Sequence, residues 1–297
     1  MCNEPSFKAT CCLIGAALFV PATLLAQGEH QRQQVVMNGK ASIHVTVRGR
    51  GVPIVFIPSF GRGVHDFDEL SKRLARSGYQ TILPEPRGIG SSTGPLEGIT
   101  LHDLAADVAA VIQVFGGRAI VTGHGFGSRV ARTVATDHPG MVRHLVLLAC
   151  GGTVPMSEKN RDVFLRVFDP SLPKKERLAA VGSVFFANGH DPKVWEGGWY
   201  FDTARAQQAA NAATPVKEWW GAGSAPILVL QGTEDIVAVP ENSERLAKEF
   251  PDRVRLIQIP NSGTLCFLNN RTSSHRPWLL ISSHRAACGR TIPRLRT

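Results

Sequence analysis

Short apolar runs alternate along this chain with longer stretches in which apolar residues recur at helical spacing. The short runs predict buried strands, at residues 52–57, 79–83, 118–121, 142–149, 226–230 and 254–259. The longer stretches predict helices, at residues 66–77, 100–115, 128–136 and 241–250. Because strands that alternate with helices are joined by right-handed crossovers, the pattern predicts a largely parallel sheet with helices on both faces.

Two segments do not follow this alternation of strands and helices. Residues 41–47 alternate between apolar and polar and lead into Arg-Gly-Arg-Gly at 48–51, which predicts a hairpin turn there. Residues 154–223 contain no strand-like run but several helical stretches, together with four of the five tryptophans. We interpret this segment as a helical insertion between two parts of one core, at residues 27–153 and 224–263. The tryptophans are more typical of packing than of ligand contact.

The N-terminus has the pattern of an export signal. Lys8 precedes an apolar run at residues 9–26, and a polar stretch follows. Ala26 is a suitable small residue before a cleavage site, so residues 1–26 are predicted to be a signal peptide. The alternative is a retained membrane anchor, for which the run is barely long enough. We expect a periplasmic or secreted protein with no stable membrane span after the signal is removed.

Composition narrows the class of protein. A hydrophobic content of 43% and a charged content of 19% are typical of a soluble globular chain. The net charge of +9 would favour nucleic acid as a partner, but residues 264–297 contain six arginines and no acidic residue. The rest of the chain therefore carries only +3, so we expect no nucleic acid partner and a small-molecule substrate or ligand instead.

We expect neither a metal nor a cofactor. Three of the six cysteines lie in the predicted signal, and the other three have no zinc-site or Cys-x-x-Cys spacing; Cys150, at the end of a strand, is expected to be a buried thiol. The glycines at 123, 125 and 127 lack the spacing of a dinucleotide-binding loop.

The most informative motif is Gly-His-Gly-Phe-Gly at residues 123–127, between a predicted strand and a predicted helix. Gly-x-Ser-x-Gly in that setting is typical of a nucleophile elbow, in which a sharp turn presents a serine oxygen. Gly125 stands at the apex and has no side chain. The motif therefore has the backbone frame of a serine hydrolase but lacks the attacking atom, and an aspartate nucleophile is excluded in the same way.

Three further motifs accompany this one in a fixed order. The full set is Ile-Pro-Ser-Phe-Gly at 57–61, Glu-Pro-Arg-Gly-Ile-Gly-Ser-Ser at 85–92, the elbow, and Gln-Gly-Thr-Glu-Asp-Ile-Val-Ala-Val-Pro at 231–240. Together they resemble the α/β-hydrolase superfamily over about residues 35–263. The resemblance implies a mostly parallel twisted sheet with helices on both faces and a helical cap at residues 154–223.

The resemblance also assigns roles to particular residues. It implies that Asp235 is the triad carboxylate and that the backbone N–H groups of Phe60 and Phe126 are the oxyanion donors. Ser59 and Ser91 lie in loops near the expected site and are interpreted as structural. His124 as a substitute base and Ser128 as a displaced nucleophile are alternatives. We instead favour packing beneath the turn for His124 and a helix-start hydroxyl for Ser128.

The catalytic histidine is missing as well. The superfamily has Gly-His after the last strand, whereas Thr264 follows Gly263 here, and residues 264–297 show no helical period. Synonymous codons for residues 263–272 can be written so that a shifted frame encodes His-Ala-Leu-Leu-Pro-Glu. We therefore interpret residues 264–297 as an aberrant tail produced by a reading-frame shift at about Gly263.

These observations lead to one functional expectation and one alternative. The chain is expected to be an exported relative of small-ester or acyl hydrolases whose serine-hydrolase activity is impaired or absent, because Gly125 and Thr264 are inert at the nucleophile and base positions. The alternative is a non-catalytic binder of a small apolar ligand in the capped pocket.

Overall fold

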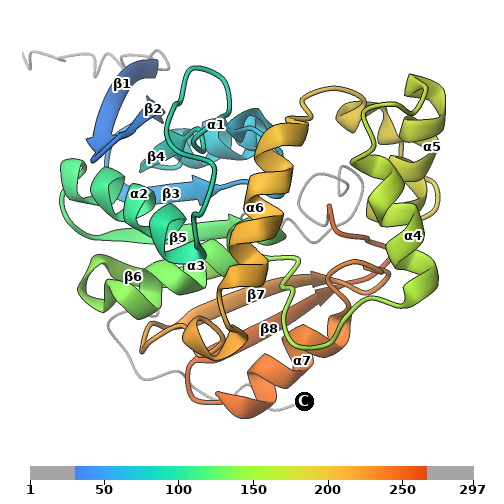
Figure 1. Ribbon diagram of the computed structural model, residues 1–297. Coiled ribbons are helices and arrows are strands. Elements are labelled where there is room, and N and C mark those ends of the chain that lie inside the picture. Colours follow the sequence, from blue (N-terminus) through green and yellow to red (C-terminus); the bar gives the residue numbers. More distant parts are fainter. Residues whose placement is uncertain (1–30, 266–297) are drawn as a thin grey trace, which may run out of the picture.

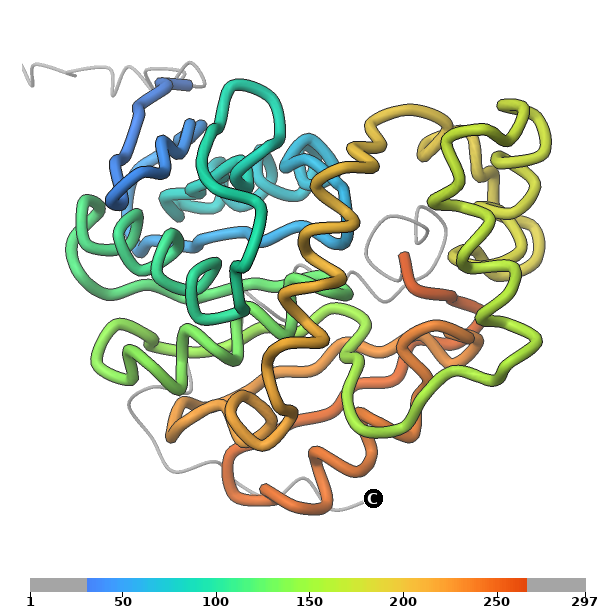
Figure 2. The backbone as a smooth tube through the Cα atoms, viewed as in Figure 1, coloured from blue at the N-terminus to red at the C-terminus, as the bar shows by residue number. Residues whose placement is uncertain are grey.

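The computed structural model describes residues 31–265 (Figures 1 and 2). The predicted signal at 1–26 and most of the predicted aberrant tail lie outside the described residues. Thr264 and Leu265 are the part of that tail that the structure describes, and both are buried.

The described residues form one eight-stranded sheet in the order β1-β2-β4-β3-β5-β6-β7-β8. Strands β3 to β8 pair in parallel, and β1 and β2 add an antiparallel edge. The predicted, largely parallel sheet is thus confirmed. The strands are β1 Gln31–Asn38, β2 Ala41–Arg48, β3 Val52–Ile57, β4 Tyr79–Pro84, β5 Ala119–His124, β6 Val142–Leu148, β7 Ile227–Gly232 and β8 Val254–Ile259.

The predicted hairpin at residues 48–51 is wrong. The strands on either side of it, β2 and β3, do not pair, because β2 pairs with β4 and β3 lies between β4 and β5. The hairpin of this region joins β1 to β2 instead, with Gly39 in the turn at φ 55°. The Gly-Arg-Gly segment makes a crossover in which a Cβ on Gly51 would lie 2.2 Å from the carbonyl oxygen of Gly78. Non-local packing, not the local turn signal, decides this pairing.

Helices cover both faces of the sheet (Figure 1). One apolar cluster joins the sheet to α2, α3 and α7, and the other joins it to α1. Thr100 caps α2 as predicted, in a capping box with Asp103. The helices are α1 Asp68–Arg76, α2 Leu101–Val114, α3 Phe126–Asp137, α4 Glu158–Val167, α5 Lys174–Phe185, α6 Phe201–Ala213 and α7 Pro240–Glu249, with 3₁₀ turns at Val64–Phe67, Pro139–Met141, Pro192–Trp195 and Val216–Glu218.

The segment predicted as a cap contains α4, α5 and α6 and no strand. In Figures 1 and 2, α4 and α5 lie beyond the ends of the central strands, on the opposite side of α6 from β1 and β2. A separate apolar cluster built around Phe164, Phe185 and Trp195 holds this part together, and Leu265 packs into it. The domain limits themselves remain a prediction. Within residues 31–265, no helix is both long and apolar enough to cross a membrane.

The backbone around α3 packs too closely to admit side chains. A Cβ on Gly127 would lie 2.2 Å from the carbonyl oxygen of Ile57 and 2.6 Å from that of Pro58. We expect Gly127→Ala to lower the free energy of unfolding by about 3 kcal/mol, at the upper end of overpacking costs, because backbone atoms cannot rotate away. Urea unfolding measures the loss. Gly140→Ala is the matched control, since nothing lies within 4 Å of its Cβ. Equal midpoints for the two variants would contradict this close packing.

Candidate functional site

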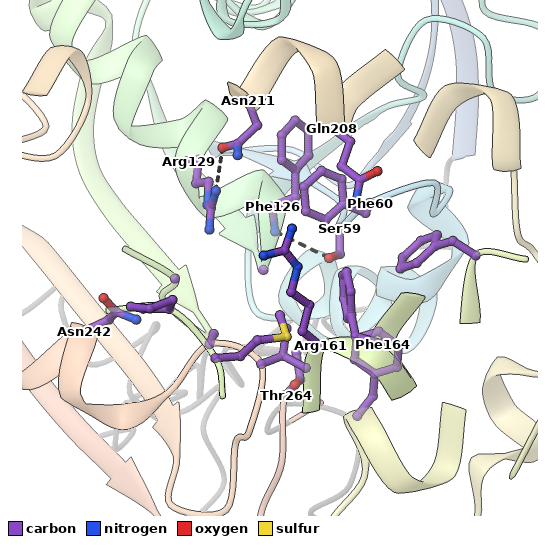
Figure 3. Close-up of a pocket in the computed structure, with 18 of the residues that line it drawn as sticks. Ser59, Phe60, Phe126, Arg129, Arg161, Phe164, Gln208, Asn211, Asn242 and Thr264 are labelled. Atoms are coloured by element: carbon purple, nitrogen blue, oxygen red, sulfur yellow. Dashed lines mark hydrogen bonds between the residues drawn. The ribbon is translucent and has the colours of Figure 1, made fainter. Parts of the chain in front are cut away.

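A cavity of about 420 Å³ lies where the loops after the parallel strands meet the helices of the predicted cap (Figure 3). Its walls combine the core with the segment 154–223. The core contributes loop and helix residues that include Ser59, Phe60, Gly125, Phe126, Arg129, Val237 and Thr264. The cap segment contributes residues of three helices, among them Arg161, Phe164, Phe185, Gln208 and Asn211. The cavity brings together residues from three of the four sequence motifs, those at 57–61, 123–127 and 231–240, whereas no residue of the motif at 85–92 lines it.

Gly125 occupies a sharp turn between β5 and α3 and lines this cavity. Its φ of 53° and ψ of −112° lie in a region that favours glycine, and its N–H donates to the carbonyl oxygen of Leu148 at 2.9 Å. The flanking glycines permit the turn, since a Cβ on Gly123 would lie 2.2 Å from the carbonyl oxygen of Gly127. The structure therefore has the predicted strand–turn–helix frame, with no side chain at its apex.

The Ser59 hydroxyl lies in the space that a side chain at position 125 would need. A Cβ added to Gly125 would lie 2.5 Å from Oγ of Ser59 and 3.3 Å from its Cβ. Ser59 Oγ also accepts a hydrogen bond from the N–H of Phe126 at 3.4 Å (Figure 3). Sequence reasoning treated Ser59 as a structural loop residue and missed its position. Only the three-dimensional contact with Gly125 reveals it.

Phe60 and Phe126, the predicted sources of the oxyanion donors, lie side by side. Their rings stack with centroids 4.2 Å apart, and both residues line the cavity. The N–H of Phe126 is partly engaged by Ser59, so a ligand oxygen would have to compete for it. The role of these two N–H groups as oxyanion donors remains a prediction.

Asp235 lies in the loop after β7 and is almost fully buried, with 2% of its surface exposed. Its Oδ1 accepts three hydrogen bonds, from the N–H groups of Val237 and Ala238 at 2.9 Å each and from the Thr264 hydroxyl at 2.8 Å. Gln231 donates to Oδ2 at 3.3 Å. Burial nevertheless raises the pKa of Asp235 to about 6, because these neutral donors only partly offset the loss of water.

Thr264 holds the position at which the resemblance to the superfamily implies a histidine. Its hydroxyl donates to Asp235, as an imidazole N–H would, but a hydroxyl does not take up a proton at neutral pH. Its carbonyl oxygen lies 3.0 Å from Nε2 of His124, and since a carbonyl only accepts, Nε2 carries the proton. Full burial lowers the pKa of His124 to about 4, so the imidazole is neutral. His124 thus ties β5 to the loop after β8, which fits packing beneath the turn.

Two further expectations from the sequence fit the structure. Ser128 is fully buried and its hydroxyl donates to the carbonyl oxygen of Gly125 at 2.6 Å, so it is a helix-start hydroxyl that does not line the cavity. Cys150 is also fully buried, and burial raises the pKa of its thiol. Within residues 31–265, no cluster of three or more His, Cys, Asp or Glu side chains has the arrangement of a metal site.

The sequence of this chain is similar to those of several known proteins. A family profile described as alpha/beta hydrolase fold matches residues 52–177. A non-heme chloroperoxidase from Streptomyces lividans is 29% identical over 66% of this chain and 81% of its own length. A 2-(acetamidomethylene)succinate hydrolase from Mesorhizobium japonicum is 32% identical, over 37% of this chain and only 40% of that protein.

Solved structures agree in fold. An esterase from Exiguobacterium antarcticum superposes with a TM-score of 0.73 at 20% identity, over 86% of this chain and all of that chain. A likeness at this identity concerns the arrangement of the elements alone. The mostly parallel sheet and its flanking helices are therefore features of a shared fold.

The raised pKa of Asp235 makes stability depend on pH. Between about pH 4 and pH 6 the folded carboxyl retains a proton that the unfolded chain releases at its usual pKa of 3.8, so stability falls as the pH rises through this window. Asp235→Asn removes this dependence while its side-chain oxygen can still accept from Val237, Ala238 and Thr264. The difference in unfolding free energy, wild type minus variant, should fall by about 2 kcal/mol between pH 4 and pH 7.

Urea unfolding of both chains at several pH values measures this difference. Titration of His124 has the opposite effect on stability: because its pKa is lowered in the folded protein, stability falls as the pH falls. His124 is present in both chains, so its contribution cancels in the difference. A difference that stays constant across the pH range would contradict the assignment to Asp235.

Proposed function

Because the chain belongs to the α/β-hydrolase superfamily, we propose that it is a relative of small-ester and acyl hydrolases that has lost the serine-hydrolase reaction. The observation that carries the proposal is Gly125, which lines the cavity at the apex of the turn and offers no oxygen. The names of two similar proteins, an esterase and a hydrolase of an acetamido compound, support an acyl compound as the ligand.

The reaction needs three groups that act together. A hydroxyl attacks the acyl carbon, an imidazole takes its proton, and a carboxylate orients the imidazole. Gly125 cannot supply the first group, and Thr264 cannot supply the second. Asp235 remains, but its Oδ1 already accepts three hydrogen bonds. When the nucleophile is missing, an acceleration of about 10³–10⁴-fold over the reaction in water typically remains, supplied by the oxyanion donors and by binding alone.

Ser59 does not restore the missing chemistry. Its hydroxyl faces the apex, but the described residues that line the cavity include no His, Asp or Glu to accept its proton. A serine hydroxyl without a general base is a weak nucleophile. The geometry therefore favours a protein that binds a ligand without converting it.

Export remains part of the proposal. Residues 1–26 have the charge and apolar run of a signal peptide, and they lie outside the described residues. We propose that the mature chain acts in the periplasm or outside the cell.

A second candidate function is non-catalytic binding of a small apolar compound. The observation that favours it is the intact cavity, whose volume of about 420 Å³ is within the range of ligand sites and whose wall includes several phenylalanines. Calorimetry against a panel of small esters and carboxylic acids should give dissociation constants in the micromolar-to-millimolar range, about 4–8 kcal/mol of binding free energy. A panel that produces no binding heat would contradict this function.

Restoring the missing groups tests the proposed loss of catalysis. Wild-type protein should not react with a fluorophosphonate probe, and it should not hydrolyse p-nitrophenyl acetate faster than its Ser59→Ala variant. The triple variant Ser59→Ala, Gly125→Ser, Thr264→His should be labelled at position 125, which mass spectrometry locates. Ser59 is changed because its hydroxyl would otherwise meet the new side chain.

The matched control carries alanine in place of serine at position 125, with the other two changes kept. It should remain unlabelled, since it gains the base without a nucleophile. If the wild-type protein is labelled and the Ser59→Ala variant is not, Ser59 is a nucleophile and the proposal is overturned.

A further inference from the structure

The charges around the cavity are of one sign. The ionisable side chains among its described lining residues are those of Arg62, Arg129 and Arg161, and no Asp or Glu accompanies them. The remaining wall is largely aromatic and aliphatic. A cavity that presents guanidinium groups without carboxylates attracts anions, so the next question is which of these charges are already neutralised.

Arg62 is neutralised within the protein. It pairs with Asp66 through two hydrogen bonds, Nε to Oδ2 at 2.9 Å and Nη2 to Oδ1 at 2.6 Å, and both residues are buried. Its guanidinium also lies over the rings of Trp195 and Trp199, at 4.4 and 4.7 Å from their centroids. A bidentate buried pair of this kind fixes the wall and leaves no net charge for a ligand.

Arg129 has no such partner. No carboxylate within residues 31–265 forms an ion pair with it, and its guanidinium donates from Nη1 to Oδ1 of Asn211 at 2.5 Å. Burial and the neighbouring Arg132 lower the pKa of Arg129 to about 10, which still leaves it protonated at neutral pH. Arg129 is half-buried, and a cation that is largely removed from water is normally paired with an anion, which Arg129 lacks within residues 31–265.

Arg132 adds a second uncompensated charge just behind the first. It is fully buried, stacks 4.5 Å from the ring centroid of Trp219, and forms no ion pair within the described part of the chain. Its Nη1 has no hydrogen-bond partner there. Cys150 lies near both arginines but supplies no negative charge, because burial raises the pKa of its thiol. Positive charge is thus concentrated behind this wall of the cavity, although Arg132 itself does not line it and its Nε donates to the carbonyl oxygen of Ser128.

Arg161 approaches the same space from the cap segment. It belongs to α4, its side chain is exposed, and no acidic side chain of residues 31–265 pairs with it. Figure 3 shows its side chain extending into the cavity toward the side on which Arg129 and Phe126 lie. Two unpaired guanidinium groups, one from the core and one from the cap, therefore face a single ligand volume.

We propose that the cavity binds an acyl compound that carries a carboxylate, held by Arg129 and Arg161. Arg129 follows Phe126 by one helical turn on α3, so a ligand whose carboxylate meets Arg129 places its acyl group beside Phe60, Phe126 and the apex at Gly125. Guanidinium groups match the planar geometry of carboxylates. This inference rests on the proposed function, since it names the class of ligand that the same cavity takes.

The test compares two ligands that differ by charge alone. Monoethyl glutarate carries an ester and a carboxylate, and the corresponding ester with a terminal carboxamide has nearly the same shape without the charge. Calorimetry on the full-length chain should show that the carboxylate binds at least about tenfold tighter, the preference expected for charge-assisted hydrogen bonds. Arg161→Gln should lower this preference to about threefold, because Arg129 can still donate to the carboxylate.

Lys159→Gln is the matched control. Lys159 also lies exposed on α4 and carries the same charge, but it does not line the cavity, so its loss should leave the preference unchanged. Arg129→Gln should abolish the preference. If this substitution prevents folding, the comparison of Arg161→Gln with Lys159→Gln is sufficient to test the inference.

The outcomes separate this inference from the proposed function. Equal binding of the two ligands to wild-type protein, or equal preferences in Arg161→Gln and Lys159→Gln, would overturn the carboxylate site and leave the binding function standing. Absence of binding by both ligands would overturn both.

Discussion

The close packing of α3 against the ends of β3 and β5 positions the apex of the turn and the residues of α3 that line the cavity. Gly123 and Gly127 leave no room for a Cβ because backbone oxygens lie about 2.2 Å from where one would be. This contact sets the direction of α3, and with it the positions of Phe126 and Arg129 on the cavity wall. Gly125 lines the cavity at the apex although it has no side chain, so the frame of the site persists without its nucleophile.

A second constraint joins the ends of β5, β7 and β8. Thr264 donates its hydroxyl to Asp235 and accepts from Nε2 of His124, which holds three loops together through one residue. The arrangement keeps a buried carboxylate with neutral donors only. Burial raises the pKa of this carboxyl to about 6, and the hydrogen bond from Thr264 offsets only part of that effect.

The strands buried on both faces were predictable because their residues are apolar in unbroken runs, and Gly125 and Asp235 were located by motifs that are local in sequence. β1 was missed because it is an edge strand in which Val36 is the one buried residue. The hairpin at 48–51 failed because pairing with β4 is decided by distant residues. Ser59, Arg129 and Arg161 lie far apart in the sequence without a common period, so only the fold brings them to one cavity.

Gly125 and Ser59 fit one another as a pair. The hydroxyl that the elbow lacks is replaced in space by one from the loop after β3, so the apex is filled rather than hollow. The replacement changes what the oxygen does, because Ser59 Oγ accepts from the N–H of Phe126, the donor predicted to meet a ligand carbonyl. A carbonyl must therefore compete with Ser59 for that donor, while a carboxylate meets Arg129 and Arg161 without a competing anion. The geometry accordingly favours charge recognition over oxyanion binding as the main source of affinity.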